Sequence, residues 1–230
     1  MRKIDQDLLQ AVSDGSLEHV RSSLHRGANV NARDQWGRPV LSLILHNLEA
    51  RNRKRIVELL LKNQVKLDKG GWEIPAICES AKLNDVGMVK LLFKRTKDPG
   101  RALFHIWMND SLSVAKFLVS QKVNVNMRWK GWTPLHSVLG GDALESAKFL
   151  IRHKAGLNVR DSDGITPMHK LAEIYDSNRH NSMVVFCLKN GASMFIKNHK
   201  GQTPINLLPQ ASDRDWVALM VKRYGIDRQS

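Results

Sequence analysis

The sequence predicts an all-α fold, a solenoid in which helix-turn-helix units stack along one axis. The first observation is a recurring phrase: residues 131–136 read GWTPLH, residues 164–169 read GITPMH and residues 201–206 read GQTPIN. The threonines of these phrases follow one another at intervals of 33 and 37 residues. Such a motif at a period near 33 residues is typical of stacked helical arrays, which grow by adding units.

The second observation is an apolar stretch that recurs later in six of the units. Its spacing gives a helix one apolar face and leaves a polar position for solvent. The copies occupy residues 56–61, 88–93, 114–119, 146–151, 183–188 and 216–221. At intervals of 33, 36, 26, 32, 33 and 37 residues, the matching unit starts are Gln6, Pro39, Pro75, Arg101, Thr133, Thr166 and Thr203. Seven units therefore fill the chain.

The helix pairs begin and end at residues suited to those positions. Thr133 and Thr166 can cap the first helix of their units, because a side-chain oxygen satisfies N–H groups that the helix leaves unpaired. The proline after each threonine fits the first turn, where no N–H is needed. Gly27 and Gly191 are expected to end second helices in the left-handed conformation. Where proline replaces the threonine, at the second and third starts, the hydroxyl cap is lost.

These motifs resemble those of the ankyrin-repeat family, and the resemblance covers essentially all 230 residues. It extends to the linking phrases GANVNARD at residues 27–34, VNVN at 123–126 and GAS at 191–193. The resemblance implies that each helix pair is followed by a β-hairpin finger projecting at right angles. We expect a single domain over residues 1–230, with capping repeats at both ends that have a solvated outer face. The units are expected at about residues 4–33, 34–70, 71–98, 99–127, 128–160, 161–197 and 198–228.

Three places depart from the regular repeat. Four extra residues separate the two helices near residues 49–53 and again near 176–180. The connection at residues 94–100 is too short for a full finger, so we expect a truncated hairpin or a plain turn. Since each unit of an array contacts only its neighbours, the junction at residues 94–101 is expected to be the least stable point.

Tryptophans concentrate near the predicted fingers. The resemblance implies that a partner contacts the finger tips and the concave face of the first helices, and four of the six tryptophans lie at or beside a tip. Tryptophan next to arginine or lysine is typical of a binding hot spot. The alternative is that each ring folds back onto the neighbouring finger. The predicted partner-binding residues are Arg33, Trp36, Arg38, Trp72, Arg128, Trp129, Lys130, Trp132, Arg160, Lys197, His199 and Lys200.

The remaining tryptophans, and several histidines and cysteines, are expected to have structural roles. Trp107 and Trp216 follow the helix pattern and are expected in the core. His136 and His169 belong to the recurring phrase and are expected to bond to the backbone, holding the hairpin to its helix. No nucleophile triad, carboxylate pair, phosphate loop or metal cluster emerges, so no catalytic residue, metal or cofactor is predicted. Packing positions are likewise expected for His105, Cys78 and Cys187.

Two features keep more than one interpretation. The basic run RNRKR at residues 51–55 suits a nuclear-import signal or a contact for an acidic ligand, although a solvated loop between two helices is favoured. Asn31, Asn126 and Asn158 lie where members of the resembled family can be hydroxylated, which would be a modification that the chain receives.

Charge and hydropathy narrow the functional class. A net charge of +14 favours acidic partners. No signal peptide is evident, the apolar runs are too short to span a membrane, and two distant cysteines fit a reduced, intracellular setting. We expect a monomeric, non-enzymatic protein-interaction module, either an adaptor, an inhibitor or an effector. It is expected in the cytoplasm, with the nucleus and a host cell as alternatives. A nucleic acid or another polyanion on the basic surface is the alternative partner, and an enzyme is the third class.

Overall fold

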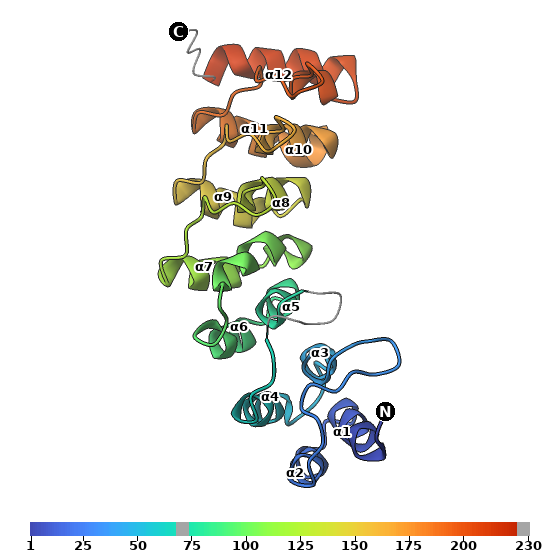
Figure 1. Ribbon diagram of the computed structural model, residues 1–230. Helices are drawn as coiled ribbons and strands as arrows, with labels where there is room; N and C mark the ends of the chain where they lie inside the picture. The colour runs from blue at the N-terminus through green and yellow to red at the C-terminus, as the bar shows by residue number, and fades with distance from the viewer. Residues whose placement is uncertain (68–73, 225–230) are drawn as a thin grey trace. The chain divides into compact units, whose positions relative to one another are not determined.

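The computed structural model describes residues 1–67 and 74–224, so Trp72 lies outside the described residues. Within them the regular structure is helical, and β-pairing is confined to isolated bridges (Figure 1). This confirms the predicted all-α class. The helices are α1 (Lys3–Ser13), α2 (Leu17–His25), α3 (Val40–His46), α4 (Arg53–Lys62), α5 (Ala76–Lys82), α6 (Val86–Phe93), the 3₁₀-helix η2 (Pro99–Asn109), α7 (Leu112–Ser120), α8 (Pro134–Gly140), α9 (Leu144–Arg152), α10 (Pro167–Glu173), α11 (Ser177–Lys189), the 3₁₀-helix η3 (Ile205–Leu207) and α12 (Ala211–Tyr224).

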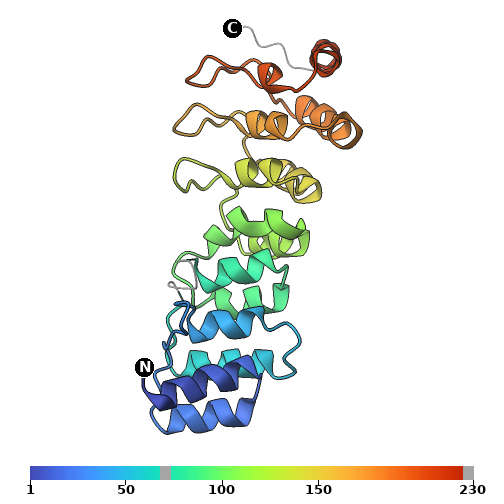
Figure 2. The same cartoon turned by 90° about the vertical axis from the view of Figure 1, so that its right-hand side faces the viewer.

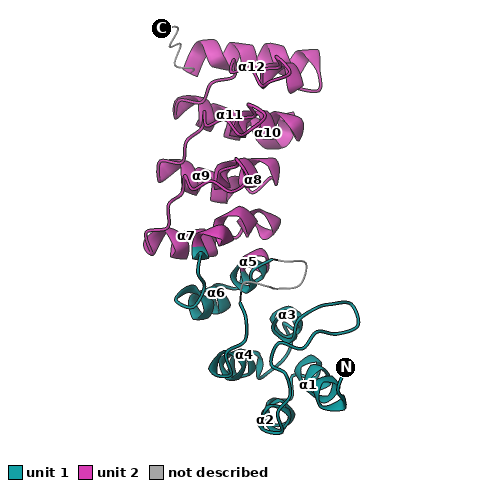
Figure 3. Cartoon of the chain, in the orientation of Figure 1, with its two compact units in different colours: residues 1–80, 85–99 teal, residues 81–84, 100–230 magenta. Residues whose placement is uncertain are grey.

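The helices belong to two compact units (Figure 3). Unit 1 comprises residues 1–80 and 85–99, and unit 2 comprises residues 81–84 and 100–230. In unit 2, α8 packs against α10, and α9 packs against α7 and α11, so first helices and second helices form separate rows. In unit 1, α1 packs against α3 and α2 against α4 in the same way. Stacked helix pairs of this kind confirm the predicted solenoid.

The core of each repeat is the apolar face that the sequence period indicates. Leu135 and Leu139 of α8 and Leu150 of α9 are fully buried. Each such leucine contributes roughly 1.5–3 kcal/mol relative to an exposed side chain. Cys78 and Cys187 are also buried, as predicted, and neither forms a disulfide.

The threonine and histidine of the recurring phrase form one hydrogen-bonded group. The capping box is present at the start of both α8 and α10. The N–H of Thr133 donates to Nδ1 of His136 (3.1 Å), so Nε2 carries the ring proton and donates to the carbonyl of Ile165 in the next repeat (3.1 Å). His169 makes the same two bonds one repeat later. Burial lowers the pKa of both histidines, which favours this neutral form. The predicted scaffold role is confirmed.

Left-handed backbone recurs where second helices end. Gly27 (φ 85°) and Gly191 (φ 92°) adopt it, as predicted. The corresponding positions of other repeats hold Gln64, Lys122 and Lys154, with φ of 61°, 62° and 68°. A side chain in this conformation costs about 1–2 kcal/mol, so the repeat geometry imposes strain where glycine is absent.

Asparagines join successive repeats beyond these turns. Oδ1 of Asn126 accepts the N–H of Gly156 (2.8 Å), and its Nδ2 donates to the carbonyl of Lys154 (2.9 Å). Asn158 makes an equivalent pair of bonds one repeat later, and Asn31 accepts a backbone N–H with its Oδ1. The structure therefore gives all three asparagines a scaffold role that the sequence does not indicate.

The short connection and the two insertions noted in the sequence adopt different local structures. Residues 94–98 form a turn without a finger, as predicted. The extra residues at 49–53 lie mainly in turns, whereas those at 176–180 mostly lengthen α11 at its start. The insertions thus occupy different kinds of local structure.

The basic run at residues 51–55 is only partly the predicted solvated loop. Its last three residues form the first turn of α4, so that prediction is wrong for them. Arg53 is largely buried, forms an ion pair with Asp85 and donates from Nε to the carbonyl of Ile44 (3.2 Å). Arg53 is therefore a structural residue within unit 1.

Candidate functional site

The finger at residues 128–133 is a tight two-residue hairpin. Trp129 and Trp132 exchange both backbone N–H···O bonds, each of 3.0 Å. Lys130 (φ 51°) and Gly131 (φ 85°) form the turn, and two central residues with positive φ are typical of a type I′ hairpin. Side chains directly opposite each other on paired strands project from the same face. The turn therefore places both indoles on one side of the finger.

Other described fingers are built differently, because their loops are one residue longer. In each, one Oδ1 atom accepts two backbone N–H groups of the loop, and this oxygen belongs to Asp34, Asp161 or Asn198. The finger at residues 128–133 has no such side chain. Figure 2 shows the fingers of the last three repeats projecting to the same side of the helices of unit 2.

A row of side chains on η2 faces the tight hairpin. Residues three apart are eclipsed along a 3₁₀-helix, so Arg101, Phe104 and Trp107 follow one another on one side. Phe104 meets the ring of Trp129 edge-on, with centroids 5.9 Å apart, and the Arg101 guanidinium lies 4.8 Å from the same centroid. The Trp129 ring thus folds back onto the preceding repeat, and not onto a neighbouring finger. It is half-buried there.

Trp107 is exposed, so its predicted core position is wrong. It retains 38% of its accessible surface, and Trp216 is only half-buried. A Cβ at Gly141 would lie 2.7 Å from the Cβ of Trp107, so glycine at the end of α8 makes room for the indole. Trp132 is half-buried, and Nζ of Lys170 lies 5.1 Å from its ring centroid.

These aromatic residues line two adjoining pockets, which we call the aromatic groove. The larger pocket has a volume of about 450 Å³, and the smaller one has about 260 Å³. Both include Trp107, Trp132 and Ser137. The larger pocket adds Lys82, Phe104, His105, Trp129 and Lys130. The smaller pocket adds His136, Gly140, Gly141, Lys170 and Glu173. All of these residues belong to unit 2.

The aromatic groove is electropositive. Burial, together with the charges of Lys82 and Arg101, lowers the pKa of His105 to about 4, so this half-buried imidazole is neutral at pH 7. Nε of Arg101 is buried and has no hydrogen-bond partner among the described residues. Glu173 supplies a carboxylate, but it is paired with Lys170 (2.9 Å). The groove therefore offers apolar surface and positive charge together.

Comparison with known proteins agrees with the repeat fold. Residues 77–161 match a family model described as ankyrin repeats in three copies. The chain carries ankyrin repeats. The human ASB11 ankyrin repeat domain superposes with a TM-score of 0.72 at 16% identity, over 93% of this chain and 96% of that one. The ankyrin repeat domain of Bcl-3, described as a unique member of the IkappaB protein family, gives 0.71 at 16% identity, over 94% and 97%. No curated protein matches the chain by sequence.

The predicted binding residues occupy different parts of the ankyrin array. Trp129, Lys130 and Trp132 line the aromatic groove, whereas Trp36 belongs to unit 1 and is 70% exposed. The Arg38 guanidinium lies 4.8 Å from the Trp36 centroid and forms an ion pair with Asp34. Arg33 donates to the carbonyl of Gly37 (2.6 Å). At the finger that follows α11, Lys197, His199 and Lys200 are all exposed.

Two of the predicted arginines connect ankyrin fingers to one another. Nη1 of Arg128 donates to the carbonyl of Arg160 (3.1 Å), and Nη2 of Arg160 donates to the carbonyl of Lys197 (3.1 Å). Each arginine is exposed, yet each holds the backbone of the next finger. The sequence indicates contacts for a partner at these positions and does not reveal the bonds between fingers.

The groove residues that sequence reasoning missed include Lys82, Phe104, Trp107 and Lys170. Trp107 and Phe104 come from η2, whose row of three-residue spacing differs from that of an α-helix. The available signal was the finger at residues 128–133, which has one residue fewer than its neighbours and therefore pairs two tryptophans directly.

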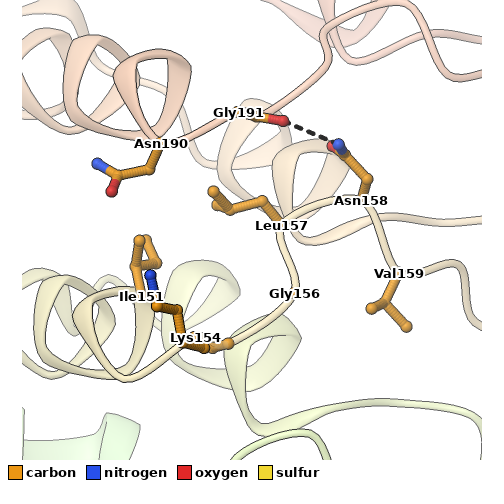
Figure 4. A pocket seen from close by; sticks show the side chains of 9 residues that line it. Ile151, Lys154, Gly156, Leu157, Asn158, Val159, Asn190 and Gly191 are labelled. Atoms are coloured by element: carbon orange, nitrogen blue, oxygen red, sulfur yellow. Dashed lines mark hydrogen bonds between the residues drawn. The ribbon is translucent and has the colours of Figure 1, made fainter.

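A third pocket, also open and with a volume of about 450 Å³, lies where α9 leads into the next ankyrin finger (Figure 4). Asn158 points toward the chain that follows α11, and its Nδ2 donates to the carbonyl of Gly191 (2.9 Å). Its Oδ1 accepts the N–H of Ser193 (2.8 Å). The Asn158 amide in this pocket is thus engaged in joining two repeats.

Residues 1–67 and 74–224 contain no group of three or more His, Cys, Asp and Glu side chains that could hold a metal ion. Over the same residues, no helix combines the length and the apolar character needed to cross a membrane.

Proposed function

We propose that this chain is a protein-interaction module, without catalytic activity, that binds a segment of a partner protein in the aromatic groove. The observation that carries the proposal is the convergence of Trp107, Trp129 and Trp132 on one open surface. Tryptophan offers a large apolar area, and a small number of such residues often supplies most of the binding free energy of an interface. Ankyrin repeats generally serve as interaction modules, which supports the same class of function.

An adaptor, an inhibitor and an effector would all use such a groove, because each role needs a rigid surface that holds another protein. Helices and a hairpin closed by two backbone hydrogen bonds hold the side chains of the groove. Because these side chains are already held in place, binding costs less conformational entropy. The proposal therefore concerns the surface and its kind of partner.

Affinity capture from the native cell tests the proposal. The bait is the full chain, either wild type or carrying Trp129→Ala together with Trp132→Ala. The matched control is Trp36→Ala, which removes an exposed tryptophan from unit 1. We expect a protein partner to be retained by the wild type and the control, and to be reduced at least about tenfold on the double variant. Circular dichroism checks that the variants fold. Equal capture by all three baits would contradict the proposal.

A polyanion is the second candidate, because lysine and arginine side chains lie against the tryptophan rings of the groove. Stacking of bases on aromatic rings within a basic groove is a common mode of single-strand binding. Affinity for a random oligonucleotide that falls steeply with salt, and that requires the two finger tryptophans, would favour this candidate.

A further inference from the structure

The larger pocket of the aromatic groove has mainly aromatic walls. Phe104, Trp107, Trp129 and Trp132 supply its aromatic surface, and its volume of about 450 Å³ lies within the range of ligand pockets. Trp107 keeps 38% of its surface exposed in this region. An inserted apolar side chain would cover such surface, and burial of apolar area is the main favourable term in most protein association.

Positive charge surrounds the larger pocket. Lys82 and Lys130 line it, from the end of α5 and from the turn of the tight hairpin. Arg101 and Lys170 lie over the rings of the two finger tryptophans. Among the residues that line the two pockets, the one carboxylate is that of Glu173, which is paired with Lys170. A cationic guest would therefore meet like charge, whereas a guest carboxylate would meet several cations.

The smaller pocket continues the same surface toward α10. It shares Trp107, Trp132 and Ser137 with the larger pocket and ends at Lys170 and Glu173. An extended peptide, which advances about 3.3 Å per residue, can place successive side chains along such a continuous surface. The groove thus suits a short linear segment better than a single small molecule.

We infer that the aromatic groove recognises an acidic peptide segment. One large apolar side chain of the segment enters the pocket between Trp107, Trp129 and Trp132, and neighbouring Asp or Glu carboxylates pair with Lys82 and Lys130. The inference rests on the proposed function, because it specifies the partner segment for the same groove.

Selection from a library of random peptides displayed on phage tests the inference, and it does not require the partner to be identified. The library is selected on the full wild-type chain and counter-selected on a chain carrying Trp107→Ala, Trp129→Ala and Trp132→Ala. We expect the enriched peptides to share a large apolar residue flanked by Asp or Glu. Enrichment of basic or neutral motifs, or no enrichment that depends on the tryptophans, would overturn the inference.

Charge reversal provides the second measurement, and it leaves the aromatic packing intact. The binding of a labelled Asp-Asp-Phe-Asp-Asp peptide and of the selected peptides is measured by fluorescence anisotropy. We expect Lys82→Glu with Lys130→Glu to weaken binding at least tenfold. Lys116→Glu with Lys122→Glu, at two exposed sites on and just after α7, changes the net charge by the same amount and should alter binding less than twofold. Equal losses in both variants would mean that net charge, and not the groove, attracts the peptide, which would overturn the inference.

Two competitors separate the remaining alternatives. Lys-Lys-Phe-Lys-Lys should not displace the acidic peptide, because the groove already carries positive charge. A random single-stranded oligonucleotide should displace it only at much higher concentration, and stronger displacement by either competitor would refute acidic-peptide recognition. The proposed function fails on a different result, namely partner capture that is unaffected by Trp129→Ala with Trp132→Ala.

Discussion

Replacing His136 by asparagine should remove a bond between repeats while keeping the bond within the repeat. Asn206 shows the expected geometry, because it occupies the histidine position of a later phrase and its Oδ1 accepts the N–H of Thr203 (2.9 Å). The shorter amide cannot take the place of Nε2, which donates to the carbonyl of Ile165. The substitution therefore isolates the contact between α8 and the next finger.

The size of the effect follows from the atoms that lose a partner. The Ile165 carbonyl keeps a second donor, the N–H of Asp161 at 2.9 Å, so the lost bond is worth about 0.5–1.5 kcal/mol. The ring is fully buried, and the space left by the smaller amide adds roughly 1 kcal/mol. We expect His136→Asn to lower the free energy of unfolding by about 2 kcal/mol. His136→Ala should lower it by about 3–4 kcal/mol, because the N–H of Thr133 then loses its acceptor as well.

Urea unfolding followed by far-ultraviolet circular dichroism measures both losses. His25→Asn is the matched control, because this histidine is exposed on α2. It should change stability by less than about 0.5 kcal/mol. Equal losses for the asparagine and alanine variants would refute the separation into two bonds. An asparagine variant as stable as the wild type would refute the contribution of the bond between repeats.

The same residue predicts a pH effect, since burial lowers the pKa of His136 below its usual 6.5. The unfolded chain then binds the proton first as pH falls, so the free energy of unfolding should decrease below pH 6.5, by at most about 1.4 kcal/mol per pH unit for each such histidine. A urea midpoint that stays constant between pH 7 and 5 would contradict this. Lys154→Gly should raise the free energy of unfolding by about 0.5–1 kcal/mol, and the thermal midpoint with it, because φ of 68° suits glycine. A lower midpoint would show that the lysine is not strained. Gly141→Ala should destabilise by about 1–3 kcal/mol and change the tryptophan fluorescence, because the new Cβ meets Trp107 at 2.7 Å. An unchanged spectrum would argue against that contact. Hydrogen exchange should be faster at residues 94–101 than in the repeats with complete Thr-Pro phrases, and better protection there would be evidence against a weak junction.

Much of the scaffold could be predicted because it depends on local rules. The Thr-Pro start, the histidine three residues after the threonine and the glycines at Gly27 and Gly191 each answer a requirement of the backbone near them. Such requirements are visible within one repeat and recur in the next repeat. The apolar period of the second helices is local in the same sense.

The aromatic groove could be predicted only in part, because its walls depend on conformations that the apolar period does not reveal. Trp129 and Trp132 are recognisable as finger residues, but their shared face follows from a turn whose Lys130 adopts positive φ. If the segment around Trp107 were an α-helix, its apolar period would place Trp107 in the core. In η2 the period is three, so Trp107 follows Phe104 on one side; Phe104 is buried, whereas Trp107, near the end of η2, stays exposed.

The bonds from Arg128 and Arg160 to the following fingers allow the tips to change sequence at little structural cost. Their acceptors are the backbone carbonyls of residues 160 and 197, and every amino acid supplies such an oxygen. A tip side chain can therefore be exchanged without breaking the link that reaches it. Fixed connections beneath variable tips would let the array acquire a new binding preference through surface substitutions alone.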